Sequence, residues 1–271
     1  MSTATGRRLG VSPYDSVFLP ILAALIAVAW ASLAAWTASP YGRYLDHDWT
    51  QAGFAARLCA ALPGGDIVAP ALIYVLGWLL MTTAMMLPTA MPLLRVFGRL
   101  VGARADAGRL IALAVGGYLF VWLGFGVAAH LLGLVILALA RRWVWLTFNG
   151  WAIGATLLLT AGLFQFSRLK YLCLDACGAP LGFVAARWRG RRPALESFRL
   201  GADHGLFCVG CCWALMLLLF AVGTGSIGWM MALGGAMAVE KNAPWGRRLA
   251  RPLGVALLAG AAAIAVFNLA A

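Results

Sequence analysis

Long apolar runs alternate with short polar segments along nearly the whole chain. A helix rises about 1.5 Å per residue, so about 20 apolar residues are needed to cross the hydrocarbon core of a membrane. Runs of that length occupy residues 17–38, 69–92, 110–139, 147–169, 204–222 and 252–270. A shorter run at 226–239 would reach only about 21 Å and would need a thinner bilayer or partner helices to cross. The pattern predicts an all-α, polytopic transmembrane helix bundle with about seven spans, or six if the short run does not cross.

The composition agrees with a membrane protein and excludes an ordinary soluble domain. Of the 271 residues, 63% are hydrophobic and 11% are charged, whereas soluble domains are about 25% charged. The first run follows Arg7 and Arg8 and has no clear Ala-x-Ala cleavage site before Tyr41, so we expect a retained span rather than a cleaved signal peptide. The longest polar pieces are an outer loop at 39–68 and a basic inner segment at 170–203, so residues 1–271 are expected to form a single integral membrane domain.

The distribution of basic residues predicts the orientation in the membrane. The chain has 21 Lys and Arg residues against 9 Asp and Glu residues. With seven spans and the N-terminus inside, the basic residues in outer segments are only Arg43, Arg57, Arg141 and Arg142. This positive-inside bias predicts a cytoplasmic N-terminus and a C-terminus outside. The basic excess therefore indicates topology and contact with the lipid bilayer, and we expect no nucleic acid partner.

Soft metal ligands gather at the mouth of the run that begins at residue 204. This stretch contains His204, Cys208, Cys211 and Cys212. At about 100° per residue, the three cysteines fall within one narrow sector of a helix, and His204 lies one turn earlier on the same side. These residues are therefore candidate ligands of one metal ion. A hydrated or hydrogen-bonded histidine at a helix end is the competing interpretation of His204.

A second cysteine element lies about thirty residues upstream. Cys173 and Cys177 form an i, i+4 pair, which we expect to face Cys208 and Cys212, so that the two elements close on one metal ion at the cytoplasmic side. Cytosolic thiols are kept reduced, which favours metal binding over disulfide formation. Cys59, in the predicted outer loop, is expected to be a small apolar filler.

The residue types favour a thiophilic ion. Thiolates select soft ions such as Cu(I), while cysteine also suits zinc and iron, and zinc takes four ligands in a tetrahedral site. Five cysteines with a nearby histidine exceed the ligands of a single tetrahedral site. Cu(I) is therefore the favoured ion, with zinc or iron as alternatives.

The second apolar run adds two thioethers next to prolines. Met81 and Met85 lie one turn apart on one helical face. Pro88 and Pro92 lack backbone N–H groups and are expected to free the carbonyls of Ala84 and Pro88, as in broken helices that line binding sites at membrane depth. The methionines are either packing residues or further metal ligands on a path to the cysteines, and both interpretations stay open.

The remaining charged residues near the apolar runs are expected to have ordinary roles. Asp175 and Asp203 are predicted at solvated interface positions, with a contact to the ligand residues as the alternative. Glu240 and Lys241 end the short run and are predicted to form a mutual ion pair or to snorkel toward the interface.

Several unrelated motifs occur in a characteristic order along the chain. They are Ala84-Met-Met-Leu-Pro88, Gly162-Leu-Phe-Gln-Phe166, Leu169-Lys-Tyr-Leu-Cys173, the stretch from His204 to Met216, Trp229-Met230 and Glu240-Lys241. With these motifs the chain resembles the bacterial family called predicted metal-binding integral membrane proteins, over roughly residues 70–245. The resemblance implies a multi-pass protein of the bacterial inner membrane that binds metal, without implying a reaction. It supports Cys173, Cys177, Cys208, Cys211 and Cys212 as the metal ligands.

Three functions are compatible with these features. The leading hypothesis is a protein that transports or chaperones a thiophilic ion, with an unidentified membrane or metallochaperone protein as partner. A membrane thiol oxidoreductase and a scaffold subunit of a membrane complex are the alternatives. The sequence has no phosphate-binding loop, hydrolase elbow or zinc-protease motif, so we expect no enzymatic activity and no catalytic residues.

Overall fold

The computed structural model describes residues 13–38, 68–143, 145–146, 149–222 and 226–270, and every regular element among them is helical. The elements are α1 (Pro13–Ala38), α3 (Val68–Met85), the 3-10 turn η2 (Pro88–Ala90), α4 (Met91–Val101), α5 (Ala107–Arg142), α7 (Trp151–Phe164), α8 (Arg168–Gly178), α9 (Pro180–Arg187), α10 (Pro193–Val222), α11 (Ile227–Asn242) and α12 (Gly246–Ala270). The all-α prediction is confirmed for this part of the chain. Cys59, Arg43, Arg57 and residues 39–67 of the predicted outer loop lie outside the described residues.

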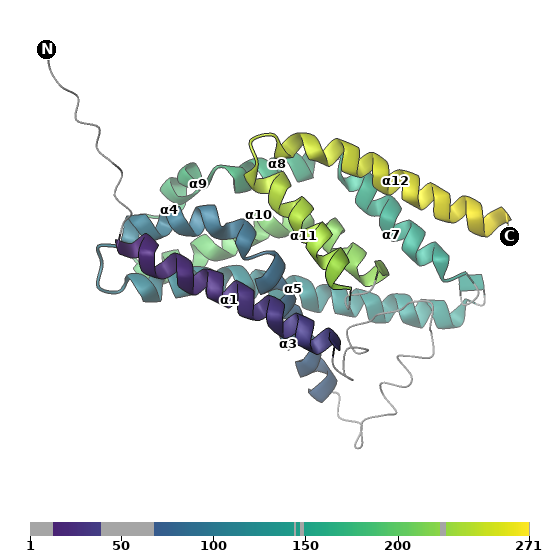
Figure 1. Cartoon of the computed structure of the whole chain (residues 1–271), viewed down its shortest axis with the longest axis horizontal. Coiled ribbons are helices and arrows are strands. Elements are labelled where there is room, and N and C mark those ends of the chain that lie inside the picture. The colour runs from purple at the N-terminus through teal and green to yellow at the C-terminus, as the bar shows by residue number, and fades with distance from the viewer. Residues whose placement is uncertain (1–12, 39–67, 144, 147–148, 223–225, 271) are drawn as a thin grey trace, which may run out of the picture.

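Helices α5 and α10 form the most extensive helix pair in the described chain, and α10 is the more deeply buried of the two (Figure 1). Glycines set the distance between them. A Cβ at Gly201 would collide with the carbonyl of Ala114, and a Cβ at Gly117 would collide with the carbonyl of Phe198. The two backbones therefore touch, which is the contact that small residues permit between membrane helices.

Two of the predicted spans are bent. Helices α3 and α4 meet at 64° across the Pro88 turn, and α7 and α8 also meet at 64°. Proline accounts for the first bend because it lacks an N–H and clashes with the preceding turn. At the second bend, Ser167 caps α8 by accepting a hydrogen bond from the backbone N–H of Lys170.

The predicted number of about seven spans is not confirmed. Four described helices are long and apolar enough to cross a membrane, or six if each bent pair counts as one span. The short predicted run at 226–239 corresponds to α11, which has 16 residues. Such a helix is about 24 Å long, short of the hydrocarbon thickness of about 30 Å. The largest number of spans that the described helices allow is therefore six, which equals the predicted alternative.

The predicted inner segment 170–203 consists largely of helix, because it contains α9, most of α8 and the beginning of α10. The turn before α10 is tied to that helix by one carboxylate. Glu196 accepts hydrogen bonds at 2.6–3.1 Å from the backbone N–H groups of four consecutive residues, 189–192. Pro193 begins α10 without an N–H that needs a partner. This arrangement fixes the start of the helix that carries the α10 cysteines.

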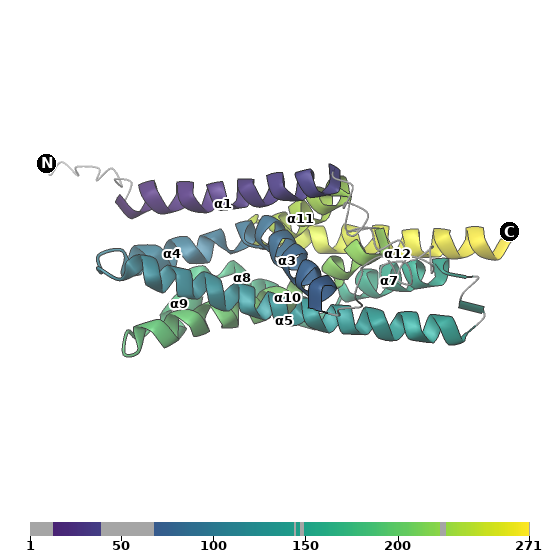
Figure 2. The same cartoon turned by 90° about the horizontal axis from the view of Figure 1, so that it is seen from below.

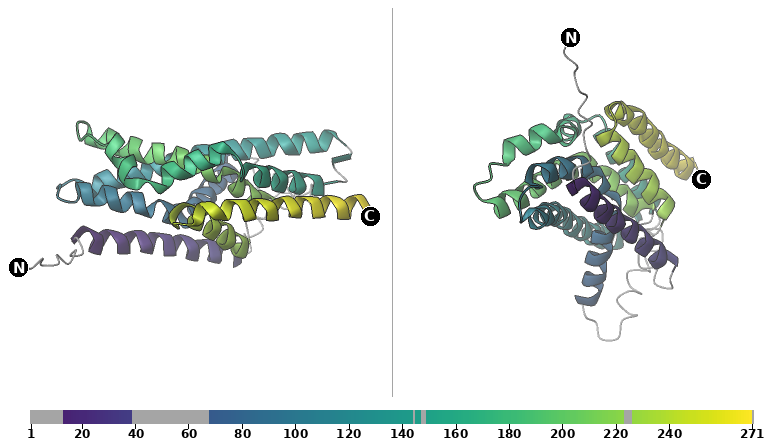
Figure 3. Two further views of the ribbon diagram at one scale, coloured as in Figure 1. Left: turned by 90° about the horizontal axis from the view of Figure 1, so that it is seen from above. Right: turned by 60° about the vertical axis from the view of Figure 1, so that its left-hand side comes forward.

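The remaining helices pack on this pair and on one another. Helix α1 packs on α3 along one edge of the bundle, as Figure 2 shows. Helices α7 and α12 pack against each other and extend toward the end of the bundle away from α1 (Figure 3). Helix α11 contacts α8, α10 and η2, and α8 contacts α10. The predicted cysteine and histidine ligands lie on α8 and α10, and the two predicted methionine ligands lie on α3.

Candidate functional site

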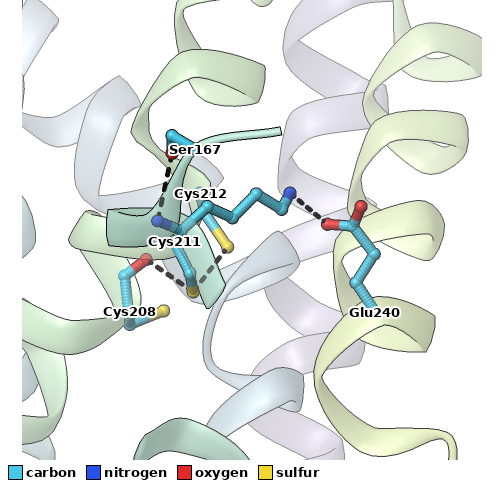
Figure 4. Close-up of polar contacts among 6 residues, drawn as sticks. Ser167, Cys208, Cys211, Cys212 and Glu240 are labelled. Carbon is cyan, nitrogen blue, oxygen red and sulfur yellow. Dashed lines mark hydrogen bonds and ion pairs between the residues drawn. The ribbon is translucent and has the colours of Figure 1, made fainter. Parts of the chain in front are cut away.

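Three thiols lie together on one side of α10. Cys208, Cys211 and Cys212 are at most 1% exposed, and all three are free cysteines. The Cys211 thiol donates to the carbonyl oxygen of Cys208 at 3.2 Å, and its Sγ lies 3.4 Å from Cys212 Sγ (Figure 4). The thiols therefore satisfy one another and the helix backbone, away from solvent.

Helix α8 brings two more thiols to the same region. Cys173 and Cys177 are each 6% exposed. Cys173 Sγ lies against Gly210 of α10, where an added Cβ would be 2.5 Å from the sulfur. Cys177 lies one turn after Cys173 on α8, and α8 packs against α10. The two cysteine elements thus approach each other, and the absence of a side chain at Gly210 makes room for the Cys173 sulfur.

Cys208 contacts two other helices, α5 and α11. Its Sγ accepts a hydrogen bond from Lys241 Nζ at 3.1 Å and lies 3.1 Å from the Tyr118 hydroxyl oxygen. The same ammonium group donates to Thr89 Oγ1 of η2 at 2.8 Å. The expectation that Cys208 and Cys212 together face α8 is therefore wrong. The physical reason is that the Cys208 thiol already contacts side chains of α5 and α11.

Two buried lysines flank the thiols. Lys241 is 5% exposed, and Lys170 is fully buried. Lys170 Nζ donates to Glu240 Oε2 at 2.7 Å, and both side chains are at most 1% exposed (Figure 4). The predicted mutual pair or snorkelling of Glu240 and Lys241 is wrong because adjacent helical residues diverge by about 100° and each side chain meets a different neighbour.

The bend between α3 and α4 supplies a carbonyl to this region. The Met86 carbonyl oxygen accepts hydrogen bonds from the hydroxyls of Thr89, at 2.7 Å, and Tyr118, at 3.0 Å. The sequence predicted a break here but expected the freed carbonyls to be those of Ala84 and Pro88. The Pro88 carbonyl is instead used within the following turn. Met86 therefore links the break to the side chains that surround Cys208.

His204 lies among aromatic rings one turn before Cys208. Its ring stacks on Tyr118, with centroids 5.9 Å apart, and meets Phe183 edge-on at 5.4 Å. It is 1% exposed, and neither ring nitrogen has a hydrogen-bond partner among the described residues. The ligand role of His204 and the competing interpretation of a hydrated or hydrogen-bonded ring both stay predictions.

The acidic residues beside this site lie at its solvated edge, as expected. Asp203 pairs with Arg187 at 2.8 Å, and its side chain is 44% exposed. Asp175 pairs with Arg247 at 2.6 Å, and its side chain is 52% exposed. Arg187 also lies over the Phe183 ring, 3.8 Å from its centroid, which closes the His204 end of the site.

Met81 and Met85 lie in the core, with exposed fractions of 4% and 3%. Met85 packs against α11 at Gly234, where an added Cβ would be 3.4 Å from the methyl carbon of Met85. This contact is that of a packing residue. A role for the two thioethers as metal ligands stays a prediction.

Within the described ranges, no group of three or more His, Cys, Asp or Glu side chains is arranged to hold a metal ion. The structure brings the two cysteine elements and His204 into one buried region, but it does not arrange them as a closed coordination shell. Binding an ion in this region therefore requires thiols to rotate away from their present hydrogen bonds. The metal-ligand roles assigned from the sequence stay predictions.

Sequence reasoning missed the polar neighbours of Cys208. Lys241 carried a usable signal because an ionisable residue inside an apolar run is a functional candidate by default. Tyr118 carried none, since it lies 90 residues from Cys208 and resembles any aromatic residue of an apolar helix. Thr89 lies 152 residues from Lys241 and was equally inconspicuous.

A comparison with protein families relates the chain to copper handling. Residues 75–264 match a family model described as PpoB2, copper chaperone. The match covers both bent helix pairs and every candidate ligand residue. No curated protein and no solved structure matches the chain.

Proposed function

The chain belongs to the PpoB2 family of copper chaperones, and from this premise we propose that it holds Cu(I) within a membrane on the thiols between α8 and α10. A copper chaperone carries its ion as cargo, so membership implies a non-enzymatic protein that binds copper. The observation that carries the proposal is the convergence of five buried, free cysteines from two helices: Cys173, Cys177, Cys208, Cys211 and Cys212.

The chemistry of these donors suits Cu(I) better than zinc. Thiolates are soft ligands and select Cu(I), which two thiolates are sufficient to bind. Structural zinc instead needs four ligands in tetrahedral order. Cys211 Sγ and Cys212 Sγ are already 3.4 Å apart, so a two-sulfur site needs only local side-chain rotation. A four-ligand site needs a larger rearrangement of α8 and α10.

His204 adds a nitrogen donor to the sulfur donors. It packs against the Phe183 ring, which Arg187 covers. Both of its ring nitrogens lack partners although the side chain is buried, and neutral imidazole is a good copper ligand. We therefore assign His204 as an additional ligand that the ion meets on its way to or from the thiols. Met81 and Met85 extend the same path on the α3 side.

The membrane location rests on the outward faces of the long helices. Apolar side chains there are broadly exposed, with 56% exposure at Leu131 on α5 and values of 66% and 77% at Val266 and Phe267 on α12. Such extended apolar surfaces are stable in lipid and not in water. We propose a single integral domain of the bacterial inner membrane with four to six spans, a cytoplasmic N-terminus and the cysteines toward the cytoplasmic side. Copper then passes to or from a protein partner at that side.

The first test measures the metal content of detergent-purified protein, prepared under reducing and chelator-free conditions and loaded with Cu(I). Wild-type protein is compared with a variant in which the five clustered cysteines become Ser. Cys59→Ser is the matched control, because it removes the remaining cysteine without touching the cluster. We expect near-stoichiometric copper in wild type and control and a loss in the five-cysteine variant. Equal copper in all three proteins would refute the thiol site.

A second measurement orders the individual ligands. Affinities for Cu(I) are determined by competition with a chromophoric Cu(I) chelator for Cys211→Ser, Cys212→Ser and His204→Ala. The thiol substitutions are expected to weaken binding by about 10-fold or more, since each removes one ligand of few. The His204 substitution is expected to slow loading more than it weakens binding. An unchanged loading rate would remove His204 from the path.

A further inference from the structure

Lys241 is a buried cation that faces the thiol cluster, and none of the carboxylates in the described part of the chain pairs with it. Its Nζ contacts Cys208 Sγ at 3.1 Å and Thr89 Oγ1 at 2.8 Å. The neighbouring carboxylate, Glu240, is already paired with Lys170. Burying an ammonium group is costly unless an opposite charge compensates it. The anion that compensates Lys241 must therefore come from the thiol side of the site.

The hydrogen bonds around Lys241 fix the position of its charge. Thr89 Oγ1 accepts from Lys241 and donates to the Met86 carbonyl at 2.7 Å, so the only proton of this hydroxyl is committed to that carbonyl. Tyr118 contacts both the Met86 carbonyl and Cys208 Sγ. The ammonium is thus held between Thr89 of η2 and Cys208 of α10, and Tyr118 of α5 contacts the same sulfur.

A Cu(I) ion bound by two thiolates forms a complex with one net negative charge. Each ligating thiol gives its proton to water when the ion binds, so the two sulfurs contribute two negative charges and the ion one positive charge. In a water-free interior this anion needs a counter-charge. We propose, on the basis of the proposed function, that Lys241 is that counter-ion and sets the selectivity of the site for a monovalent soft ion.

The same sum of ion and ligand charges disfavours a divalent ion. Zn(II) bound by two thiolates is neutral, which would leave Lys241 buried as an uncompensated cation. A third thiolate would restore neutrality, but among the described residues no three such ligands are arranged to hold a metal ion. Lys241 therefore stabilises the Cu(I) complex and opposes the Zn(II) complex. It acts as a positioning and selectivity residue, not as a ligand.

The test compares the affinities of Lys241 variants for Cu(I) and Zn(II). Lys241→Met removes the charge, Lys241→Arg keeps it, and the double variant Lys170→Met with Glu240→Gln removes a neighbouring buried pair without changing the net charge. We expect Lys241→Met to weaken Cu(I) binding by about 100-fold and to leave Zn(II) binding equal or tighter. The arginine variant and the double variant should stay within about 10-fold of wild type for both ions.

The result that overturns the proposal is a Lys241→Met protein that binds Cu(I) like wild type, or one that loses Cu(I) and Zn(II) affinity equally. Thermal unfolding without metal shows whether each variant is folded. If Lys241→Met does not fold, Lys241→Gln gives the same comparison, because it is neutral and still able to donate to Thr89. Ag(I), which has the charge and softness of Cu(I), should follow Cu(I) in every variant, and a divergence would also count against the charge argument.

This test separates the inference from the proposed function. If the five-cysteine variant retains copper, the thiol site itself is wrong. If that variant loses copper while Lys241→Met does not, the thiol site stands and only the role of Lys241 is refuted.

Discussion

Removing only one partner of the buried ion pair between Lys170 and Glu240 should strongly lower the free energy of unfolding. Lys170 lies on α8, which carries Cys173 and Cys177, and Glu240 lies on α11 beside Lys241. The pair therefore joins the two helices that place donors and counter-charge around the site. The substitution Lys170→Met removes the cation and keeps a side chain of similar length.

The structure sets the size of the effect. The two charged groups are 2.7 Å apart, and their side chains are at most 1% exposed. Removing one partner of such a pair costs about 3–5 kcal/mol because an uncompensated charge stays buried. Glu240 Oε1 has no hydrogen-bond partner among the described residues, so the carboxylate has no second contact to replace Lys170. Replacing both residues, as in Lys170→Met with Glu240→Gln, removes the buried charge and leaves an amide without a partner, which should cost about 1–3 kcal/mol.

The assay is reversible denaturant unfolding in mixed micelles, followed by tryptophan fluorescence, for wild type, both single variants and the double variant. Asp175→Asn is the matched control because it breaks an ion pair whose side chains are 57% and 52% exposed. Its cost is expected to be about 1 kcal/mol or less. The reasoning is refuted if Lys170→Met costs no more than this control, or if the double variant is as unstable as the two single variants combined.

Three further predictions follow from contacts around the site. Gly201→Ala is expected to lower the unfolding temperature strongly, because its Cβ would meet the backbone of α5. Gly116→Ala, which has open space around it, should be close to neutral. Equal effects of the two substitutions on the unfolding temperature would contradict the close packing of α5 and α10. Tyr118→Phe removes the hydroxyl that contacts Cys208 and the Met86 carbonyl and should cost about 1–3 kcal/mol in unfolding free energy; an unchanged stability would show that these contacts are dispensable. Cu(I) should protect the clustered cysteines from alkylation, as read by mass spectrometry, but not Cys59; modification of all six at equal rates would argue against the proposed site.

The sequence anticipated features that depend on local periodicity. Apolar runs of helical length predicted the all-α bundle, and the proline pair predicted a break in the second run, which lies at Pro88. The spacing of Cys208, Cys211 and Cys212 predicted one helical face. These inferences needed only the rise and rotation per residue of a helix.

The sequence did not anticipate which faces meet. A one-dimensional pattern shows that Cys173 lies on a helix, but not that Gly210 opposite has room for its sulfur. The same limit explains the error at Glu240 and Lys241. The pattern showed two charges at a helix end, while the packing of α8 and η2 decided that each has a separate buried partner.

By itself, the sequence determined a helical, apolar chain with soft ligands in two short elements, because composition and period fix secondary structure and donor chemistry. It also predicted that the two elements converge. Only the tertiary structure decided which of their residues meet, that His204 is enclosed by aromatic rings, and that Lys241 faces Cys208. These outcomes depend on contacts between residues up to 152 positions apart. Such contacts are selected by the fit of whole helix surfaces and by the cost of burying unpaired charge, neither of which a local pattern contains.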